Sequence, residues 1–460
     1  MNCTSVGFNY FSICRKSKRM STKGLSLDRI SCLPQKIIES ILSLLPIRDA
    51  LRTSVLSKRW RYCWRGMPKL TFTNNMVKLP SKCACTHMSN YKVVNAIFHV
   101  LLLHNGQCAC THMSKYKVVN AIFHVLLLHN GPTILELKGS VKLEMLSEFD
   151  PIISHLSTRN NTVKDLTLTI EDGYYNLPLS FFSVQGLEHI HLQNCGLEPP
   201  STFNGFSRLR SIVFMNVVVS AKKLQRFLSN CPLLKRLILI GHQLEVIIAF
   251  ALGGNAFTFV DLFRCAPLIN ILVISKCYTK VMYRLNIISN VMISCLFANF
   301  GLCIWLKYLS AGGMPHRLPT PLAHLKCLCL DVCLMEHNEI SSVLCMIMSS
   351  PLLEEIVFMM YDKKRLGVEQ TPTNFLDPEK YSDLKLDHLE TLLVNMTRSN
   401  LPLGMDLVKL VMAKAPVLKK VQLDLNAGVS IDDEVMMLRD LVLLPFARAS
   451  PSAKLIIRRP

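Results

Sequence analysis

The chain has 460 residues, a formal net charge of +20 at pH 7 and a hydrophobic content of 50%. This hydrophobic content excludes disorder as the general condition, and the length is sufficient for two or three domains with cores of their own. Binding to nucleic acid requires basic residues clustered on one face, and here the positive charge is spread along the chain. Charge alone therefore does not predict nucleic acid as the partner.

Residues 1–26 are expected to form a disordered basic tail. They contain the run RKSKR, whose composition is typical of a nuclear localisation signal or of a solvated tail. The tail has no basic stretch followed by an apolar run, so a secretion signal is not predicted. We therefore expect the 18 cysteines to be reduced, in a protein of the nucleus, the cytoplasm or both.

Residues 27–72 are expected to form a small helical domain that cannot bury all of its own apolar surface. Pro34 suits the first turn of a helix that carries a wide face of isoleucine and leucine and ends at Pro46. Asp49 can start a second short helix, and Ser57 can cap a third that carries two tryptophans. Three short helices in fewer than about fifty residues leave apolar surface uncovered, so a partner must cover part of it.

Residues 83–106 return almost unchanged as residues 108–131, and the two copies differ at Asn90 and Lys115. Structural repeats keep their core positions and vary elsewhere, so this near-identity indicates a recent tandem duplication or a gene-model error. Each copy holds a Cys-X-Cys-X-His cluster, and this alternate spacing differs from the Cys-X2–4-Cys knuckle of zinc sites. We expect residues 73–132 to be a linker with a duplicated helix and no metal.

A diverged motif, L-x-x-L-x-L, recurs along the rest of the chain. Its first positions are 24, 22 and 25 residues apart, within the range of leucine-rich repeats, and then 35, 56, 28, 36 and 29 apart. The longer spacings indicate insertions or degraded repeats. Each unit of such a repeat buries its apolar face only by stacking on its neighbours. The motif begins at Val163, Leu187, Leu209, Leu234, Ile269, Leu325, Leu353, Leu389 and Leu418.

The segments between these motifs are expected to be helical where the pattern is clearest. Leu224, Phe227 and Leu228 fall on one helical face, and Pro232 ends that element just before the next strand. The sequence predicts a leucine-rich-repeat solenoid with parallel strands over residues 133–375. The alternative is an ordinary mixed domain with many leucines, which an antiparallel hairpin between the motifs at Leu187 and Leu209 would support.

Residues 285–306 contain no charge over twenty-two positions, which is the length of a membrane span. Three asparagines, two serines and a glycine interrupt the run, and no second span accompanies it. We expect a buried part of a soluble core, with membrane insertion as the alternative.

No catalytic constellation is present in the sequence. A glycine-rich phosphate loop, a G-x-S-x-G elbow and an H-E-x-x-H motif are all lacking. The acidic run of Asp432, Asp433 and Glu434 follows Ser430 and is typical of a capping box and a first helical turn. The sequence therefore predicts a protein that acts by binding, with no catalytic residue, no cofactor and no metal.

The stretch LPQKIIESILSLLPIRDALRTSVLSKRWRYCW, residues 33–64, resembles the F-box. Its signature items, Leu-Pro, an Ile/Leu-rich helix, a Pro-containing turn and Val-Leu-Ser-Lys-Arg-Trp-Arg, occur in the order of that family. With the repeats and the C-terminal stretch beginning LETLLVNM, the whole chain resembles plant F-box/FBD/LRR proteins, where FBD denotes the F-box-associated C-terminal domain. The resemblance implies an α/β fold: a helical F-box, a leucine-rich-repeat solenoid and an FBD-like α/β segment over residues 376–460.

The same resemblance implies the substrate-recognition subunit of an SCF (cullin-RING) ubiquitin ligase, not itself an enzyme. The F-box would dock on a Skp-type adaptor, and the repeats would hold a protein substrate; no membrane partner is expected. Skp-type adaptors are acidic, and residues 28–65 hold eight basic against three acidic residues, which favours electrostatic steering. The alternative is a basic leucine-rich scaffold, or a nucleic-acid-associated protein, outside a ubiquitin ligase. The expected adaptor contacts are Leu33, Pro34, Ile37, Ile38, Ile41, Leu42, Leu45, Leu51, Val55 and Trp60.

Overall fold

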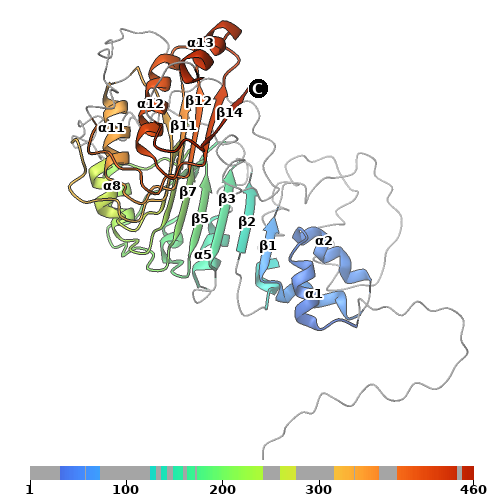
Figure 1. The fold of residues 1–460 in the computed structure, drawn as a ribbon. Helices are drawn as coiled ribbons and strands as arrows, with labels where there is room; N and C mark the ends of the chain where they lie inside the picture. The colour runs from blue at the N-terminus through green and yellow to red at the C-terminus, as the bar shows by residue number, and fades with distance from the viewer. Residues whose placement is uncertain are drawn as a thin grey trace, which may run out of the picture.

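The protein, seen in a computed structural model, is a small helical part followed by one long parallel sheet that carries helices along one face (Figure 1). The strand β1 belongs to the sheet and directly follows the helical part. The structure describes residues 32–56, 58–72, 125–130, 136–141, 149–158, 163–170, 173–241, 259–275, 315–335, 337–361, 381–442 and 448–459.

The helical part begins with α1, Gln35–Leu42, whose first turn is set by a proline. Pro34 has φ of −54°, and its carbonyl accepts from the N–H of Ile37 at 3.0 Å, so the predicted start is confirmed. The helix ends at Leu42 and not at Pro46, because the chain leaves the helix in a tight turn in which Leu45 N–H donates to Leu42 O at 2.9 Å.

The next elements are α2, Ile47–Arg52, and two 3₁₀ helices, η1, Thr53–Val55, and η2, Trp60–Gly66. The predicted start of the second helix at Asp49 was wrong by two residues, since Pro46 takes the position before the first turn. The third element is a 3₁₀ helix that follows Arg59, and Ser57, the predicted cap, lies outside the described residues.

Within the described residues, twelve parallel strands form one sheet in the order β1-β2-β3-β5-β7-β8-β9-β10-β11-β12-β13-β14. Two short strands, β4 and β6, pair separately. The strands are β1 Lys69–Phe72, β2 Glu136–Val141, β3 Asp165–Ile170, β4 Tyr175–Asn176, β5 His189–Gln193, β6 Cys195–Gly196, β7 Ser211–Met215, β8 Arg236–Ile240, β9 Ile271–Ser275, β10 Cys327–Val332, β11 Glu355–Met360, β12 Thr391–Met396, β13 Lys420–Leu425 and β14 Lys454–Arg458.

All nine predicted motifs lead into strands, and they are in one register. The pairing that decides between solenoid and hairpin is parallel, with His189 opposite Ser211. The longest spacing, before β10, leaves the register intact, since Ile271 lies opposite Cys327. The fourth motif positions therefore form a ladder across the sheet: Leu166, Ile190, Ile212, Leu237, Leu272, Leu328, Ile356, Leu392 and Val421.

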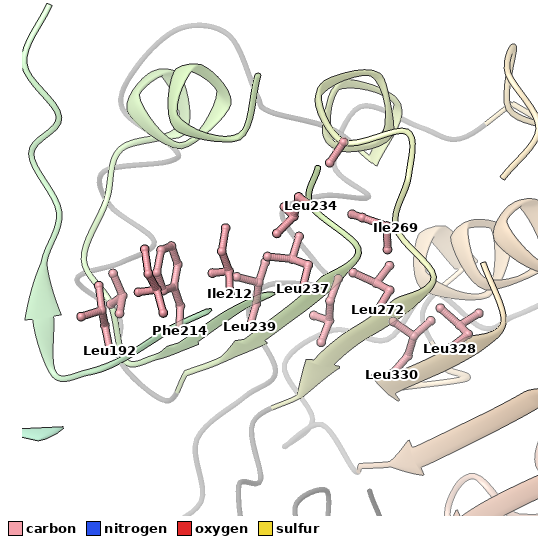
Figure 2. Close-up of a cluster of buried hydrophobic side chains, with 14 of the residues drawn as sticks. Leu192, Ile212, Phe214, Leu234, Leu237, Leu239, Ile269, Leu272, Leu328 and Leu330 are labelled. Atoms are coloured by element: carbon pink, nitrogen blue, oxygen red, sulfur yellow. The ribbon is translucent and has the colours of Figure 1, made fainter. Parts of the chain in front are cut away.

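Ladder side chains point from the strands to the helices and form the main core (Figure 2). Phe181, Phe203, Phe206 and Phe227 extend this core along successive repeats, with ring centroids 5.1 to 5.8 Å apart. The covering helices are α5 Asp150–Thr158, η6 Leu179–Ser183, α6 Ala221–Ser229, α8 Phe259–Cys265, α11 His337–Met348, α12 Leu401–Lys414 and α13 Ile431–Val442. The predicted apolar face of α6 is confirmed, since Leu224, Phe227 and Leu228 are buried.

Asparagines turn the chain after two neighbouring strands. Asn194 and Asn216 have φ of 55° and 49°, a left-handed conformation that asparagine tolerates better than most residues. Asn194 Nδ2 donates to Ile170 O at 2.7 Å, and Asn216 Nδ2 donates to Asn194 Oδ1 at 3.0 Å. These bonds link three successive repeats on the carboxyl side of their strands.

Asn400 links three further repeats across the predicted boundary between the solenoid and the FBD-like segment. It is fully buried, and its Oδ1 accepts from Leu334 N–H at 2.8 Å. Its Nδ2 donates to Tyr361 O and to Thr397 Oγ1, each at 2.9 Å. The sheet also continues from β11 to β12 in register, so strands on either side of the predicted boundary belong to the same sheet.

The face of the sheet opposite the helices is also apolar in its central strands. Alternate residues of β7 to β12 form a second buried cluster on that face. Ile238 and Val273 are fully buried there. Side chains of neighbouring strands stand side by side on a sheet, so they do not by themselves shield the whole face from water. The cluster is Val213, Met215, Ile238, Ile240, Val273, Cys329, Val357, Met359 and Leu393.

The end of the second duplicated copy packs on the helical part. Val125 and Leu126 are fully buried, Asn130 N–H donates to Arg65 O at 3.1 Å, and His129 Nε2 donates to Met67 O at 2.9 Å. The two Cys-X-Cys-X-His clusters and residues 285–306 lie outside the described residues. No helix in the described ranges is long and apolar enough to cross a membrane.

We predict that both faces of the central sheet contribute comparably to stability. Leu237→Ala removes a side chain from the main core, and Ile238→Ala removes one from the opposite face. Each is expected to lower the free energy of unfolding by about 2–5 kcal/mol, measured by urea denaturation. A loss below about 1 kcal/mol for Ile238→Ala would show that its face is open to solvent.

We also predict that the first duplicated copy is dispensable. Deleting residues 81–106 keeps Val125, Leu126 and the hydrogen bonds of His129 and Asn130 to the helical part. The melting temperature should therefore remain within error of the intact chain. Loss of the cooperative transition in a calorimetric scan would show that both copies are packed into the core.

Candidate partner-docking site

Helix α1 presents an apolar face that no described residue covers. Ile37 is 46% exposed and Ile41 38%, one turn apart, and the face continues through Leu44 at 83% and Leu45 at 36%. The opposite side of the same helix is closed, because Ile38 and Leu42 are fully buried. We name the four exposed residues, Ile37, Ile41, Leu44 and Leu45, the α1 face.

Helix α1 packs on the buried core of the helical part. Trp60, Cys63 and Trp64 of η2 are buried, together with Leu51 of α2, and α1 packs against η2. The guanidinium of Arg59 donates to the carbonyl of Leu33, which fixes the chain just before the helix begins. The α1 face is thus displayed on a packed core.

Of the ten predicted contacts, four are buried, one is half-buried and four are exposed, and the burial of the tenth is not described. Ile38, Leu42, Leu51 and Trp60 are buried inside the helical part, so they support the surface without being reachable from outside. Leu33 is half-buried and packs on the same core, and the burial of Val55 lies outside the described residues. Only Pro34, Ile37, Ile41 and Leu45 are exposed.

Three exposed apolar residues of the helical part are not among the ten predicted contacts. Leu44, Leu56 and Tyr62 are 83%, 68% and 46% exposed. Leu44 is absent from the expected contacts, and its exposure comes from the turn that ends α1 at Leu42. The other two follow from the 3₁₀ geometry of η1 and η2, which an α-helical expectation places differently.

The helical part that carries this surface also exposes several basic side chains. Lys36, Arg52, Lys58 and Arg59 are exposed, and Asp49 pairs with Arg52 at 3.3 Å. The guanidinium of Arg65 stacks 4.5 Å from the ring centroid of Tyr62. An apolar centre with a basic rim suits a partner with an apolar groove and acidic edges.

Two chemical features of the described residues can be stated, one for metal ligands and one for thiols. No group of three His, Cys, Asp or Glu side chains in these ranges is placed to hold a metal ion. Burial raises the pKa of the Cys231 and Cys345 thiols to about 11, and that of Cys327 to about 12, so they stay protonated at neutral pH.

Comparisons with known families identify both parts of the chain. The F-box domain family matches residues 30–72, the region of α1, α2, η1, η2 and β1. A second family, described as the At1g61320/AtMIF1 LRR domain, matches residues 138–283. F-box and leucine-rich-repeat families generally contain non-catalytic adaptor-type proteins.

The relatives agree with these families. F-box/FBD/LRR-repeat protein At1g13570 of Arabidopsis thaliana is 28% identical over 447 residues, covering 94% of this chain and 99% of the relative. FBD-associated F-box protein At5g56370, from the same plant, is 57% identical over 47 residues, 10% of this chain and 11% of the relative. A solved LRR protein of Leptospira interrogans, LIC12759, covers 80% of this chain and 100% of its own at 13% identity, with a TM-score of 0.23.

The fold and the site define an F-box protein with a leucine-rich-repeat solenoid. With the relative that spans nearly the whole chain, they place it among the plant F-box/FBD/LRR-repeat proteins.

We predict that the α1 face contributes little to the stability of the chain alone. Ile37→Ser and Ile41→Ser each remove a largely exposed side chain, so the free energy of unfolding should change by less than about 1 kcal/mol. Ile38→Ala, from the buried side of the same helix, should cost about 2–5 kcal/mol. Equal losses for all three, measured by urea denaturation, would show that the α1 face is covered in the folded chain.

Proposed function

We propose that the protein is the substrate-recognition subunit of an SCF (cullin-RING) ubiquitin ligase in the nucleus, the cytoplasm or both. F-box domains generally bind Skp-type adaptors in such complexes. The observation that carries the proposal is the exposed α1 face, held on a buried tryptophan core within residues matched by the F-box family. A soluble monomer rarely leaves a contiguous apolar patch of this kind without a partner.

The docking would be driven by burial of the α1 face and steered by charge. Removing four large aliphatic side chains from water stabilises the complex, with Ile37 and Ile41 at the centre of the patch. The exposed basic residues around it accelerate encounter with an acidic adaptor, and this contribution weakens as salt is added.

The chain would not transfer ubiquitin itself. Its contribution would be to hold a substrate lysine close to the conjugating enzyme, which raises the effective concentration of that lysine. This role requires a fixed distance between the F-box and the bound substrate. Strand β1 directly follows η2 and pairs with β2 in the sheet. Asn130 and His129 form hydrogen bonds to the helical part. The strand that directly follows the helical part is therefore joined to the sheet of the solenoid by its pairing with β2.

Substrate would bind along the solenoid, on the part of the face opposite the helices that is exposed. The central strands are closed on that face, since the alternate side chains of β7 to β12 form the second buried cluster. On β3 and β5 the same face is polar and open: Thr167, Thr169 and His191 are half-buried, and His189 is exposed. This polar region lies on the F-box side of the sheet, which favours a substrate held near the adaptor.

The test is co-purification with a Skp-type adaptor. Ile37→Ser combined with Ile41→Ser removes two side chains of the α1 face, and Leu33→Ala combined with Pro34→Ala disturbs the helix start. Each double variant should lose about 2–4 kcal/mol of binding free energy, or about thirtyfold to nearly a thousandfold in affinity. Lys36→Ala, at an exposed position of the same helix, is the matched control. It removes one of several basic side chains and no apolar contact, so it should retain most of the binding.

Equal adaptor recovery from the intact chain, both double variants and the control would refute the F-box role. Retention on nucleic acid that falls with salt, without adaptor in the eluate, would instead support the basic-scaffold alternative.

A further inference from the structure

The C-terminal end of the solenoid carries a second uncovered surface. Strand β14 pairs with β13 alone among the described residues, so its other edge is open. Lys454 N–H donates to Lys419 O at 2.9 Å. Because successive residues of a parallel strand alternate their hydrogen-bonding direction, the N–H groups of Leu455 and Ile457 point to the open edge.

Helix α13 adds apolar side chains beside this edge. Its start is the predicted capping box, in which Asp433 N–H donates to Ser430 Oγ at 3.1 Å and Ser430 N–H to Asp433 Oδ2 at 3.0 Å. Ile431, Val435 and Met436 are nevertheless 69%, 57% and 68% exposed. An amphipathic surface helix normally keeps charged or polar residues on its outer face.

The contacts of α13 show which way its exposed residues face. Asp433 meets Arg398, which follows β12, at 3.3 Å, so this side points back along the solenoid. Met437 and Leu441 are buried against the core, and Glu434 pairs with Arg459, which follows β14.

At 100° per residue, the half-buried Leu438 comes next around the helix beyond Glu434, followed by Ile431 and then Val435. Ile431 therefore lies on the flank towards the end of the solenoid, and Val435 lies between that flank and solvent. Leu455 and Ile457 of β14 are half-buried beside them and pack on the main core. We name Ile431, Val435, Leu455, Ile457 and the open edge of β14 the end surface.

The charge of the end surface is positive. Lys454 and Arg458 are exposed, and neither forms an ion pair with a described residue. Lys454 lies in register with Lys420, so two like charges are adjacent there, whereas Arg458 lies in register with Asp424. The excess of positive charge is therefore greatest at Lys454. A second copy of this chain fits poorly, because antiparallel pairing of two β14 strands about a two-fold axis brings Lys454 and Arg458 of one copy against those of the other.

We propose that the end surface binds an extended segment of a protein partner in which acidic and aliphatic residues alternate. The segment would add to β14 as the next strand, with main-chain hydrogen bonds to Leu455 and Ile457. Its acidic side chains would lie beside Lys454 and Arg458, and its aliphatic ones beside the flank of α13. This proposal does not depend on what the F-box binds.

The probe is a fluorescein-labelled peptide of alternating glutamate and valine, followed by fluorescence anisotropy with the full chain. It should bind saturably, whereas a lysine–valine peptide should not. Combining Lys454→Glu with Arg458→Glu should weaken binding at least about tenfold, and Val435→Lys should also weaken it. Combining Arg208→Glu with Lys222→Glu changes the net charge equally at exposed positions of other repeats and should leave affinity unchanged.

A glutamate–valine peptide N-methylated at alternate residues separates strand addition from simple charge attraction, and it should lose binding. The proposal is overturned if the glutamate peptide does not bind, if the N-methylated peptide binds equally well, or if both charge-reversed chains lose equal affinity. It is also overturned if the unliganded chain sediments as a dimer that Val435→Lys dissociates.

Discussion

The register of the aliphatic ladder is the constraint on which the rest of the structure depends. Each strand places its fourth motif residue beside that of its neighbour, from Leu166 to Val421, and parallel backbone hydrogen bonds hold this alignment. No single repeat can bury its own aliphatic face, so stability arises between neighbours and spreads along the whole sheet. The helices pack on this sheet, and Asn194 and the buried Asn400 form hydrogen bonds to the backbone beside its strands.

The same constraint explains why two surfaces remain for partners. Stacking buries the interior of every repeat but leaves each end of the array with one neighbour missing. At the first end, β1 is preceded by the helical F-box, whose own core closes over Trp60 and Trp64 and leaves Ile37 and Ile41 outside. At the other end, β14 and α13 present Ile431 and Val435. Between the two ends, the face opposite the helices is open only where its side chains are polar, as at Thr167.

Much of the solenoid was predictable because the leucine spacing reports directly on strand register. Three strands of the sheet were missed. Two of them depart from the pattern, since β2 has Gly139 at the last motif position and β14 has Ser452 at the first. Strand β1 fits the pattern with Met67, Leu70 and Phe72, but it lies within the residues expected to form the helical domain. The second buried cluster was not predicted either. Ile238 and Val273 alternate with ladder residues, and β-branched residues are common in strands whether or not that face is buried. In the F-box, the apolar pattern located helix α1, but periodicity alone does not separate the buried Ile38 from the exposed Ile37. That division depends on where η2 packs, which is a tertiary contact.

The most direct test of the account is isothermal titration calorimetry of the full chain with a purified Skp-type adaptor at several temperatures. Burial of the α1 face predicts saturable one-to-one binding with a negative heat-capacity change, because apolar surface leaves water. Ile37→Ser combined with Ile41→Ser should weaken that binding and make the heat-capacity change smaller. Absence of binding by the intact chain, or binding whose heat-capacity change is the same in the double variant, would contradict the account.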